Sequence, residues 1–208
     1  MPYIIRPRRV RNILSAVLGS AVLLGAVPAI ANAACPKNPS SKLLAALGDT
    51  AEYGLLSGST FESGASGWSL SGAELVSGSA YEVFGGSHAV LIKSGGTVVS
   101  PEFCVSSEYP TFRFFTRQIT NGSGHTLNVS LRYKDILGIS HTTSVAQIQP
   151  SSSWTLSPAL KLASALPLWM PGSTLNVSLV LQSSSGLIFQ SGSGTWAVSG
   201  VFIDPYSR

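Results

Sequence analysis

Short apolar segments follow one another from Phe61 to the end of the chain, and their spacing limits the fold more than any other feature. They recur about every ten residues, with Gly, Ser, Asn or Pro between them. No segment shows a sustained helical periodicity. Charged residues make up only 11% of the chain, which also favours an extracellular all-β protein. The pattern predicts an all-β fold, a two-sheet antiparallel β-sandwich of the jelly-roll type.

The expected strands are short at first and longer towards the C-terminus. They lie at 68–70, 74–76, 82–84, 89–93, 97–100, 103–105, 111–119, 126–134, 142–148, 154–162, 174–182, 187–190 and 195–203. The hexapeptide TLNVSL occurs at 126–131 and again at 174–179. Its Leu and Val alternate with Asn and Ser, so each of these strands has one apolar and one polar face. We interpret the repeat as two strands in the same half-buried environment; an ancient duplication is the alternative.

A turn between two aromatic residues opens this series of strands. Gly64 and Gly67 lie between Phe61 and Trp68, and glycine is a residue that tight turns favour. We therefore expect the turn to fix both rings in the core, with Trp68 near the closing strand at Trp196.

The N-terminus has the three parts of a secretory signal peptide. Arginines at 6–11 form the positive region, an apolar run covers 13–30, and Ala-Asn-Ala at 31–33 is a cleavage pattern. Residues 1–33 are therefore predicted to be removed, which makes the protein secreted and extracellular. An uncleaved membrane anchor and a lipoprotein acylated at Cys35 are the alternatives.

The net charge of +4 overstates how basic the folded protein is. The four arginines of residues 1–33 account for the excess, and without them basic and acidic residues balance at nine each. A nearly neutral chain lacks the basic surface that nucleic acid requires. We expect no nucleic-acid partner and no membrane contact after signal cleavage.

The two cysteines, Cys35 and Cys104, both lie beyond the signal peptide. In an oxidising compartment they are predicted to form a disulfide that fixes the N-terminal segment to the sandwich. Residues 34–60 are expected to be a tether or edge extension with one short helical turn within 41–47. The β-sandwich domain is expected to span 61–208.

The sequence carries no motif for catalysis. It lacks G-x-S-x-G, and His88, His125 and His141 are isolated from one another and from metal-site spacing. The carboxylates are few and none forms a recognisable pair. We expect no enzymatic activity, no metal and no cofactor.

The strand at 111–117, TFRFFTR, contains a candidate ligand site. Arg113, Phe115 and Arg117 would share the face opposite the core, where an aromatic ring between two guanidinium groups could bind a sugar. Trp169, between two prolines, is a second candidate as a loop platform for a sugar ring. The alternative is that Phe115 lies under a loop, that each Arg extends over it or pairs with Glu, and that Trp169 is buried.

Two motifs resemble the jelly-roll carbohydrate-binding-module and galactose-binding-like superfamily. Phe61-Glu62-x-Gly64 followed by Trp68 is similar to the opening F-E-x-G…W of those modules, and the segment 196–203, WAVSGVFI, is similar to their closing strand. The chain also resembles a group of uncharacterised secreted actinobacterial proteins, through Ser-Pro at 100–101, Cys104, PTFRFF at 110–115 and Asp-Pro-Tyr at 204–206.

The resemblance implies a non-catalytic module that binds an extracellular or cell-wall glycan. In the superfamily, a structural Ca²⁺ often lies between the opening Glu and a closing Asp pair. Glu62 matches, but Ser199-Gly200 stands where the Asp pair would be, which removes the oxygen donors that Ca²⁺ prefers. The alternative function is a structural or protein-interaction module of the cell envelope, with an envelope protein as partner and no sugar ligand.

Overall fold

The structure is a computed structural model that describes residue 35 and residues 40–78, 86–106, 111–120, 125–162, 174–184 and 194–204. The chain divides after Ala31, and every described residue belongs to the second part, Asn32–Arg208. The predicted signal peptide at 1–33 and the predicted strands at 82–84 and 187–190 lie outside the described residues. No helix among the described residues is long and apolar enough to cross a membrane.

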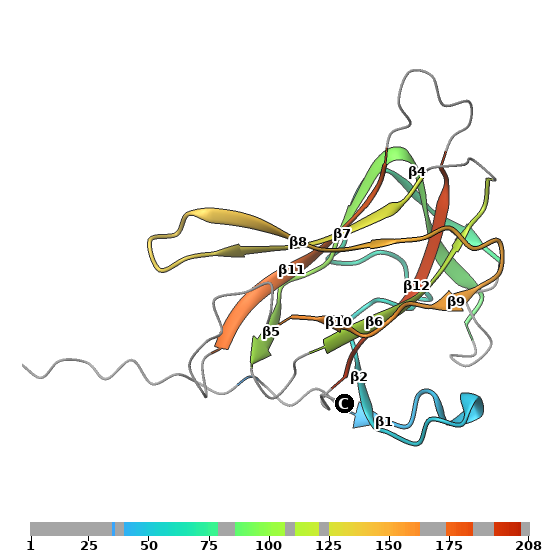
Figure 1. The fold of residues 1–208 in the computed structure, drawn as a ribbon, viewed down its shortest axis with the longest axis horizontal. Helices are drawn as coiled ribbons and strands as arrows, with labels where there is room; N and C mark the ends of the chain where they lie inside the picture. The colour runs from blue at the N-terminus through green and yellow to red at the C-terminus, as the bar shows by residue number, and fades with distance from the viewer. Residues whose placement is uncertain are drawn as a thin grey trace, which may run out of the picture. The chain divides into compact units, whose positions relative to one another are not determined.

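Strands dominate the described chain, which confirms the all-β prediction (Figure 1). One 3-10 helix, η1 (Ala45–Leu47), occurs near the N-terminus. The strands are β1 (Ser40–Ser41), β2 (Tyr53–Leu55), β3 (Ser69–Ser77), β4 (His88–Val99), β5 (Phe103–Ser106), β6 (Thr111–Gln118), β7 (Leu127–Lys134), β8 (Ser140–Ile148), β9 (Thr155–Leu156), β10 (Leu160–Lys161), β11 (Thr174–Ser183) and β12 (Trp196–Asp204).

Some predicted strands are joined in the structure and one is divided. β3 combines the segments predicted at 68–70 and 74–76, and it continues through Gly72, where φ is 60° and the pairing with β4 shifts register. β4 likewise joins 89–93 and 97–100. Glycine in these strands therefore marks a bulge and not an end.

The predicted strand 154–162 is divided at Pro158 into β9 and β10, because proline lacks the N–H that a ladder needs.

The strands form the two sheets of an antiparallel jelly-roll sandwich. The first sheet has the order β3–β4–β11–β7–β8. The second is β2–β12–β6, with β1 beside β2 and with β9 and β10 beside β6. The two sheets are joined through β4: its first half pairs with β12, and its second half pairs with β11. β5 pairs with the first half of β11.

The main core lies between the sheets. β7 buries Leu127, Val129 and Leu131, and the side chains that alternate with them face outwards. Leu131 pairs with Leu179 of β11, which is also fully buried. The two copies of TLNVSL thus lie in neighbouring strands with the same inward and outward faces, which explains their similarity by environment.

The opening turn places its two aromatic rings in the main core, as predicted. Phe61 and Trp68 are 1% and 7% exposed, and their ring centroids lie 5.1 Å apart in an edge-to-face arrangement. Trp68 Nε1 donates a hydrogen bond to the Ser57 carbonyl at 3.1 Å. Gly67 has a φ of 78°, and a Cβ there would lie 3.0 Å from Pro101, so the turn requires glycine at this position.

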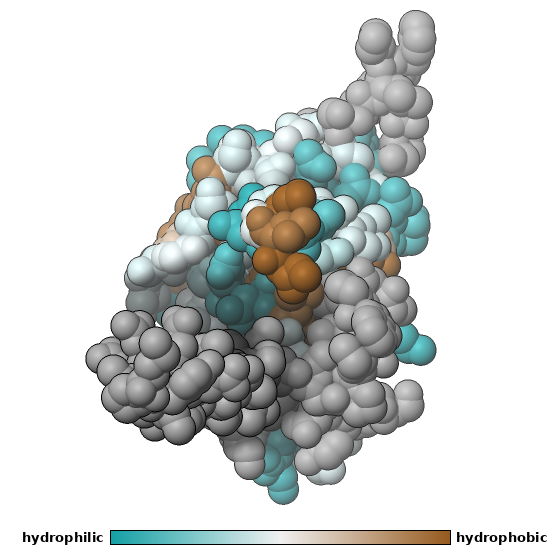
Figure 2. Space-filling model, turned by 90° about the vertical axis from the view of Figure 1, so that its left-hand side faces the viewer, coloured by the Kyte–Doolittle hydropathy of each residue, from teal (hydrophilic) through white to brown (hydrophobic). Residues whose placement is uncertain are grey.

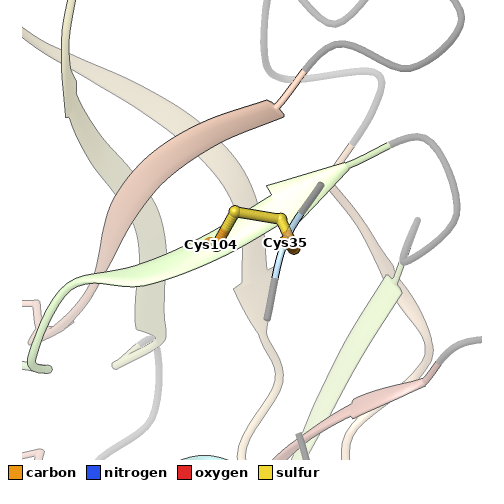
Figure 3. The surroundings of a disulfide bond; sticks show 2 residues. All are labelled: Cys35 and Cys104. Carbon is orange, nitrogen blue, oxygen red and sulfur yellow. A yellow bond between two sulfur atoms is a disulfide. The ribbon is translucent and has the colours of Figure 1, made fainter. Parts of the chain in front are cut away.

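The predicted disulfide between Cys35 and Cys104 is present (Figure 3). The two Cα atoms are 5.4 Å apart, and the bridge closes a loop with a sequence separation of 69. Cys104 lies on β5 and pairs with Asn176 of β11. The disulfide therefore joins the start of the N-terminal segment to the first sheet.

The rest of the N-terminal segment packs on the second sheet. β2 extends that sheet by pairing with the end of β12. Leu44 and Tyr53 are buried against Phe115 and Phe202 in a second, smaller core on the outer side of β6 and β12. The segment is thus an edge extension of the sandwich, and η1 corresponds to the predicted helical turn.

Removal of the Trp68 side chain tests the role of the opening turn. We expect Trp68→Ala to lower the free energy of unfolding by about 3–5 kcal/mol, because the ring leaves a cavity and Ser57 loses its donor. Urea unfolding followed by circular dichroism measures this. Leu47→Ala, at a residue 46% exposed, is the control and should change stability by less than about 0.5 kcal/mol. Equal stability of Trp68→Ala and the parent would contradict the account.

Candidate functional site

One face of the first sheet is polar. Because side chains alternate along a strand, residues paired across strands share a face. One row across the five strands carries uncharged polar side chains: Ser71, Thr97, Gln182, Asn128 and Gln147. The next row carries Ser69, Val99, Val180, Ser130 and Ser144. We call the outward side chains of β3, β4, β11, β7 and β8 the polar face.

The amides of the polar face are available to a ligand. Gln182 and Gln147 are exposed, and within the described segments neither side chain forms a hydrogen bond. Asn128 between them is half-buried and accepts one long hydrogen bond, 3.4 Å, from Thr126 Oγ1. An amide offers both donors and acceptors, so this row can match the hydroxyl groups of a sugar.

Basic side chains follow on the same face towards the β7–β8 turn. Arg132 pairs across the sheet with Ser178 and Thr142, and Lys134 lies one alternation further along β7. Both are exposed. Considering only residues that the structure describes, no carboxylate forms an ion pair with either of them. Neither charge is therefore held in an ion pair within the described protein.

A polar pocket of about 340 Å³ adjoins this basic end. It is lined by Glu102, Lys134, Asn176, Thr174 and Leu175. Asn176 is the cross-strand partner of Cys104, so the disulfide stabilises the sheet beside this pocket.

The face predicted to bind sugar, on β6, is covered. Phe115 is only 1% exposed because Leu44 and Tyr53 of the N-terminal segment and Leu156 of β9 pack over it. The expectation of an open aromatic platform at Phe115 is therefore wrong, and the alternative that Phe115 lies beneath other chain segments describes the structure. The sequence alone does not show that Phe115 is covered, because the residues that cover it lie far from it in the chain.

The two arginines on either side of Phe115 are half-buried at the edge of this cover. Arg113 Nε donates to the Ser157 carbonyl at 3.0 Å, and the Arg117 guanidinium lies 5.2 Å from the centre of the Trp154 ring. Neither pairs with a Glu in the described parts of the chain. Trp169, the other predicted platform, lies outside the described residues.

Glu62, the opening acid of the superfamily motif, binds protein groups. Its Oε1 accepts hydrogen bonds from the backbone N–H groups of Ser87 and His88, both at 2.8 Å, and its Oε2 lies 2.8 Å from His88 Nδ1. Ser199-Gly200 supplies no carboxylate and instead forms a bulge in β12. The residues present do not fit Ca²⁺, and within the described chain no three His, Cys, Asp or Glu side chains gather around a common point.

These contacts lower the pKa of Glu62 from its ordinary value of 4.5 to about 2. The largest cause is the hydrogen bond from the His88 side chain, followed by the His88 backbone N–H. The carboxylate therefore stays ionised down to strongly acidic pH. It links the opening turn to the beginning of β4.

The groups around Glu62 do not form a catalytic triad. Ser87 Oγ lies 3.1 Å from His88 Nδ1, which is the same ring nitrogen that meets Glu62. In a triad, the hydroxyl and the carboxylate contact opposite nitrogens of the imidazole ring. One nitrogen accepts the hydroxyl proton, while the carboxylate orients the ring through the other nitrogen. The second His–carboxylate pair, His141 Nε2 and Asp135 Oδ2 at 2.8 Å, lies at the exposed β7–β8 turn, and no hydroxyl group of the described residues hydrogen-bonds to the His141 ring.

Comparison with known proteins yields structural similarity only. No family model and no curated protein sequence matches the chain. Among solved structures, the enzymatically active domain of tailspike protein 4 of bacteriophage CBA120 superposes with a TM-score of 0.50 at 14% identity, over 71% of this chain and 21% of that one. At this identity the likeness shows the fold alone.

Two structures that contain CBM22-1 modules are also similar. The CBM22-1 and GH10 modules of Clostridium thermocellum xylanase 10B, complexed with xylohexaose, give a TM-score of 0.47 at 17% identity, over 72% of this chain and 28% of that one. The CBM22-1 xylan-binding domain of Paenibacillus barcinonensis Xyn10C gives 0.47 at 15% identity, over 71% and 93%. The chain thus spans only 21% of the tailspike structure and 28% of the xylanase 10B structure.

Acid unfolding tests the Glu62 contacts. Because the folded pKa lies below the ordinary value, the ionised carboxylate stabilises the fold above pH 4.5, and this contribution is lost as the pH falls towards about 2. We expect Glu62→Gln to be less stable than the parent at neutral pH, with a difference that shrinks across this interval. Urea midpoints at several pH values measure it, with Glu52→Gln, an exposed acid, as control. A constant difference at all pH values would rule out the assigned contacts.

Proposed function

We propose that this protein is a secreted, non-catalytic binding module for an extracellular or cell-wall glycan, and that the glycan lies on the polar face. The observation that carries the proposal is the row of Gln182, Asn128 and Gln147, whose amides extend across three neighbouring strands with little internal hydrogen bonding. The resemblance of the opening and closing motifs to carbohydrate-binding modules agrees with it. So do the predicted export signal at 1–33 and the disulfide.

The chemistry of this surface suits a chain of sugars. Each sugar hydroxyl is both donor and acceptor, and so is each amide or hydroxyl side chain of the row. The half-buried pair Val99 and Val180 lies beside the amides and offers an apolar strip for the C–H face of a sugar ring. Arg132 and Lys134 further along add donors that would favour a glycan bearing carboxylate, sulfate or phosphate groups.

The alternative is a structural or protein-interaction module of the cell envelope. The covered face at Phe115 removes the support that β6 would have given to sugar binding, so the glycan proposal depends on the polar face alone. Among the described residues, the two His–carboxylate contacts form neither a pair of acids nor a triad, so they lend no support to an enzymatic alternative.

Glycan binding and its location can be measured together. We expect the exported protein to bind at least one polysaccharide on an array of cell-wall and plant glycans. In titration calorimetry with that glycan, the double variant Asn128→Ala/Gln182→Ala should bind about tenfold or more weakly, because each lost hydrogen bond costs about 0.5–1.5 kcal/mol. Glu52→Ala, at an exposed position of the N-terminal segment and away from the polar face, is the matched control and should bind like the parent.

The results of these two measurements distinguish an error in the proposed function from an error in the proposed site. Silence across the array would refute glycan binding and favour the envelope-protein alternative. Binding that survives in Asn128→Ala/Gln182→Ala but is lost in Arg117→Gln would keep the function and reject the polar face.

A further inference from the structure

The turn between β7 and β8 exposes three aliphatic side chains at the tip of a hairpin. Ile136 is 102% exposed, Leu137 77% and Ile139 53%. The hairpin extends beyond the strands beside it, on the left of Figure 1. The last residue of β7 paired with β11 is Tyr133. Seen from that side, Figure 2 shows an apolar patch facing the viewer, with hydrophilic and neutral surface beside and above it.

Hydrogen bonds hold the backbone of this tip in place. Asp135 Oδ1 accepts the backbone N–H groups of Leu137 and Ile139, both at 2.9 Å. The Asp135 N–H donates to the Ile139 carbonyl at 3.0 Å, and the Gly138 N–H donates to the Asp135 carbonyl at 2.9 Å. Gly138 has a φ of 78°, which glycine adopts without strain. The loop is therefore closed on Asp135, and the aliphatic side chains stay directed away from the protein.

The base of the tip is braced as well. His141 Nε2 lies 2.8 Å from Asp135 Oδ2, and the His141 ring stacks on Tyr133 with centroids 5.3 Å apart. Asp135, the one carboxylate of the turn, is thus engaged with its own backbone and with His141. Arg132 and Lys134, which are exposed and form no ion pair with a described carboxylate, are the cations nearest the tip along β7.

We propose that the tip formed by Ile136, Leu137 and Ile139 inserts into the interface of a lipid bilayer that carries anionic headgroups. The three aliphatic side chains enter the boundary between headgroups and acyl chains, and Arg132 and Lys134 meet the lipid phosphates behind them. This contact goes beyond the proposed glycan binding and revises the expectation of no membrane contact. That expectation considered only spanning segments and net charge.

A bilayer suits this surface better than a protein partner does. A standard protein interface buries about 800 Å² on each side, which three side chains on a convex turn do not supply. The strand residues next to the tip, Ser140 and Thr142, are polar and exposed and do not continue an apolar interface. Interface hot spots are also enriched in Trp, Tyr and Arg, whereas Leu is under-represented. A fluid lipid surface needs no matching cavity.

Vesicle flotation tests the proposal on the protein as an exporting host releases it. The probes are vesicles of phosphatidylcholine alone and of equal parts phosphatidylcholine and phosphatidylglycerol. We expect binding to the mixed vesicles, and a loss of about tenfold or more in Ile136→Ser/Leu137→Ser. Any contribution of residues 1–33 is common to both proteins, so the difference between them reports the tip. Leu47→Ser, exposed but distant in sequence, is the matched control and should float like the parent.

The role of the two basic residues is tested with the double variant Arg132→Gln/Lys134→Gln. This variant should bind the mixed vesicles more weakly, and its binding should no longer depend on salt concentration. Equal flotation of the parent and Ile136→Ser/Leu137→Ser would overturn the proposal, as would no flotation of the parent. If sedimentation shows that the parent self-associates and that Ile136→Ser/Leu137→Ser does not, while neither floats, the tip is a contact between copies and the proposal is wrong.

Discussion

A bulge in strand β12 is the constraint on which the two cores depend. The register of β12 against β6 shifts between Ser199 and Phe202, and Gly200 adopts a φ of 61° there. Because of the extra residue, Val198 and Val201 both face the main core, while Phe202 faces the second core. The Gly200 N–H donates to the Ser59 carbonyl at 2.8 Å, and Ser59 Oγ donates to the Val201 carbonyl at 2.9 Å. The segment that leads into the opening turn is thereby fixed to the strand that contributes to both cores.

This arrangement leaves the two sheets with different outer faces. The outer face of β6 and β12 is apolar at Phe115 and Phe202, and the N-terminal segment covers it. The outer face of the first sheet carries amides, hydroxyls and two basic groups, and no described segment buries Gln182 or Gln147. Surface available for a ligand is therefore found on the first sheet. The difference follows from composition, because an exposed Phe115 would cost free energy while exposed amides are solvated by water.

Local patterns were sufficient for the architecture and insufficient for the site. Alternation in TLNVSL, the aromatic pair Phe61 and Trp68, and two cysteines in an oxidising compartment predicted the strands, the buried turn and the disulfide. The burial of Phe115 depends on Leu44, some seventy residues away in sequence, and no local pattern reports such a contact. The polar face was visible only in part, as the polar alternation on β7. Its extension across five strands depends on register, which needs the three-dimensional pairing.

Amide hydrogen exchange tests most directly whether the N-terminal segment closes the β6 face. With the Cys35–Cys104 disulfide intact, we expect the amides of β2 that pair with β12 to exchange slowly, like those of a core strand. After reduction, their protection should fall while that of β7 and β11 persists, because the disulfide fixes the start of this segment. Rapid exchange of β2 with the disulfide intact would contradict the account. Phe115, Arg113 and Arg117 would then form an accessible platform, and ligand binding would have to be sought on β6.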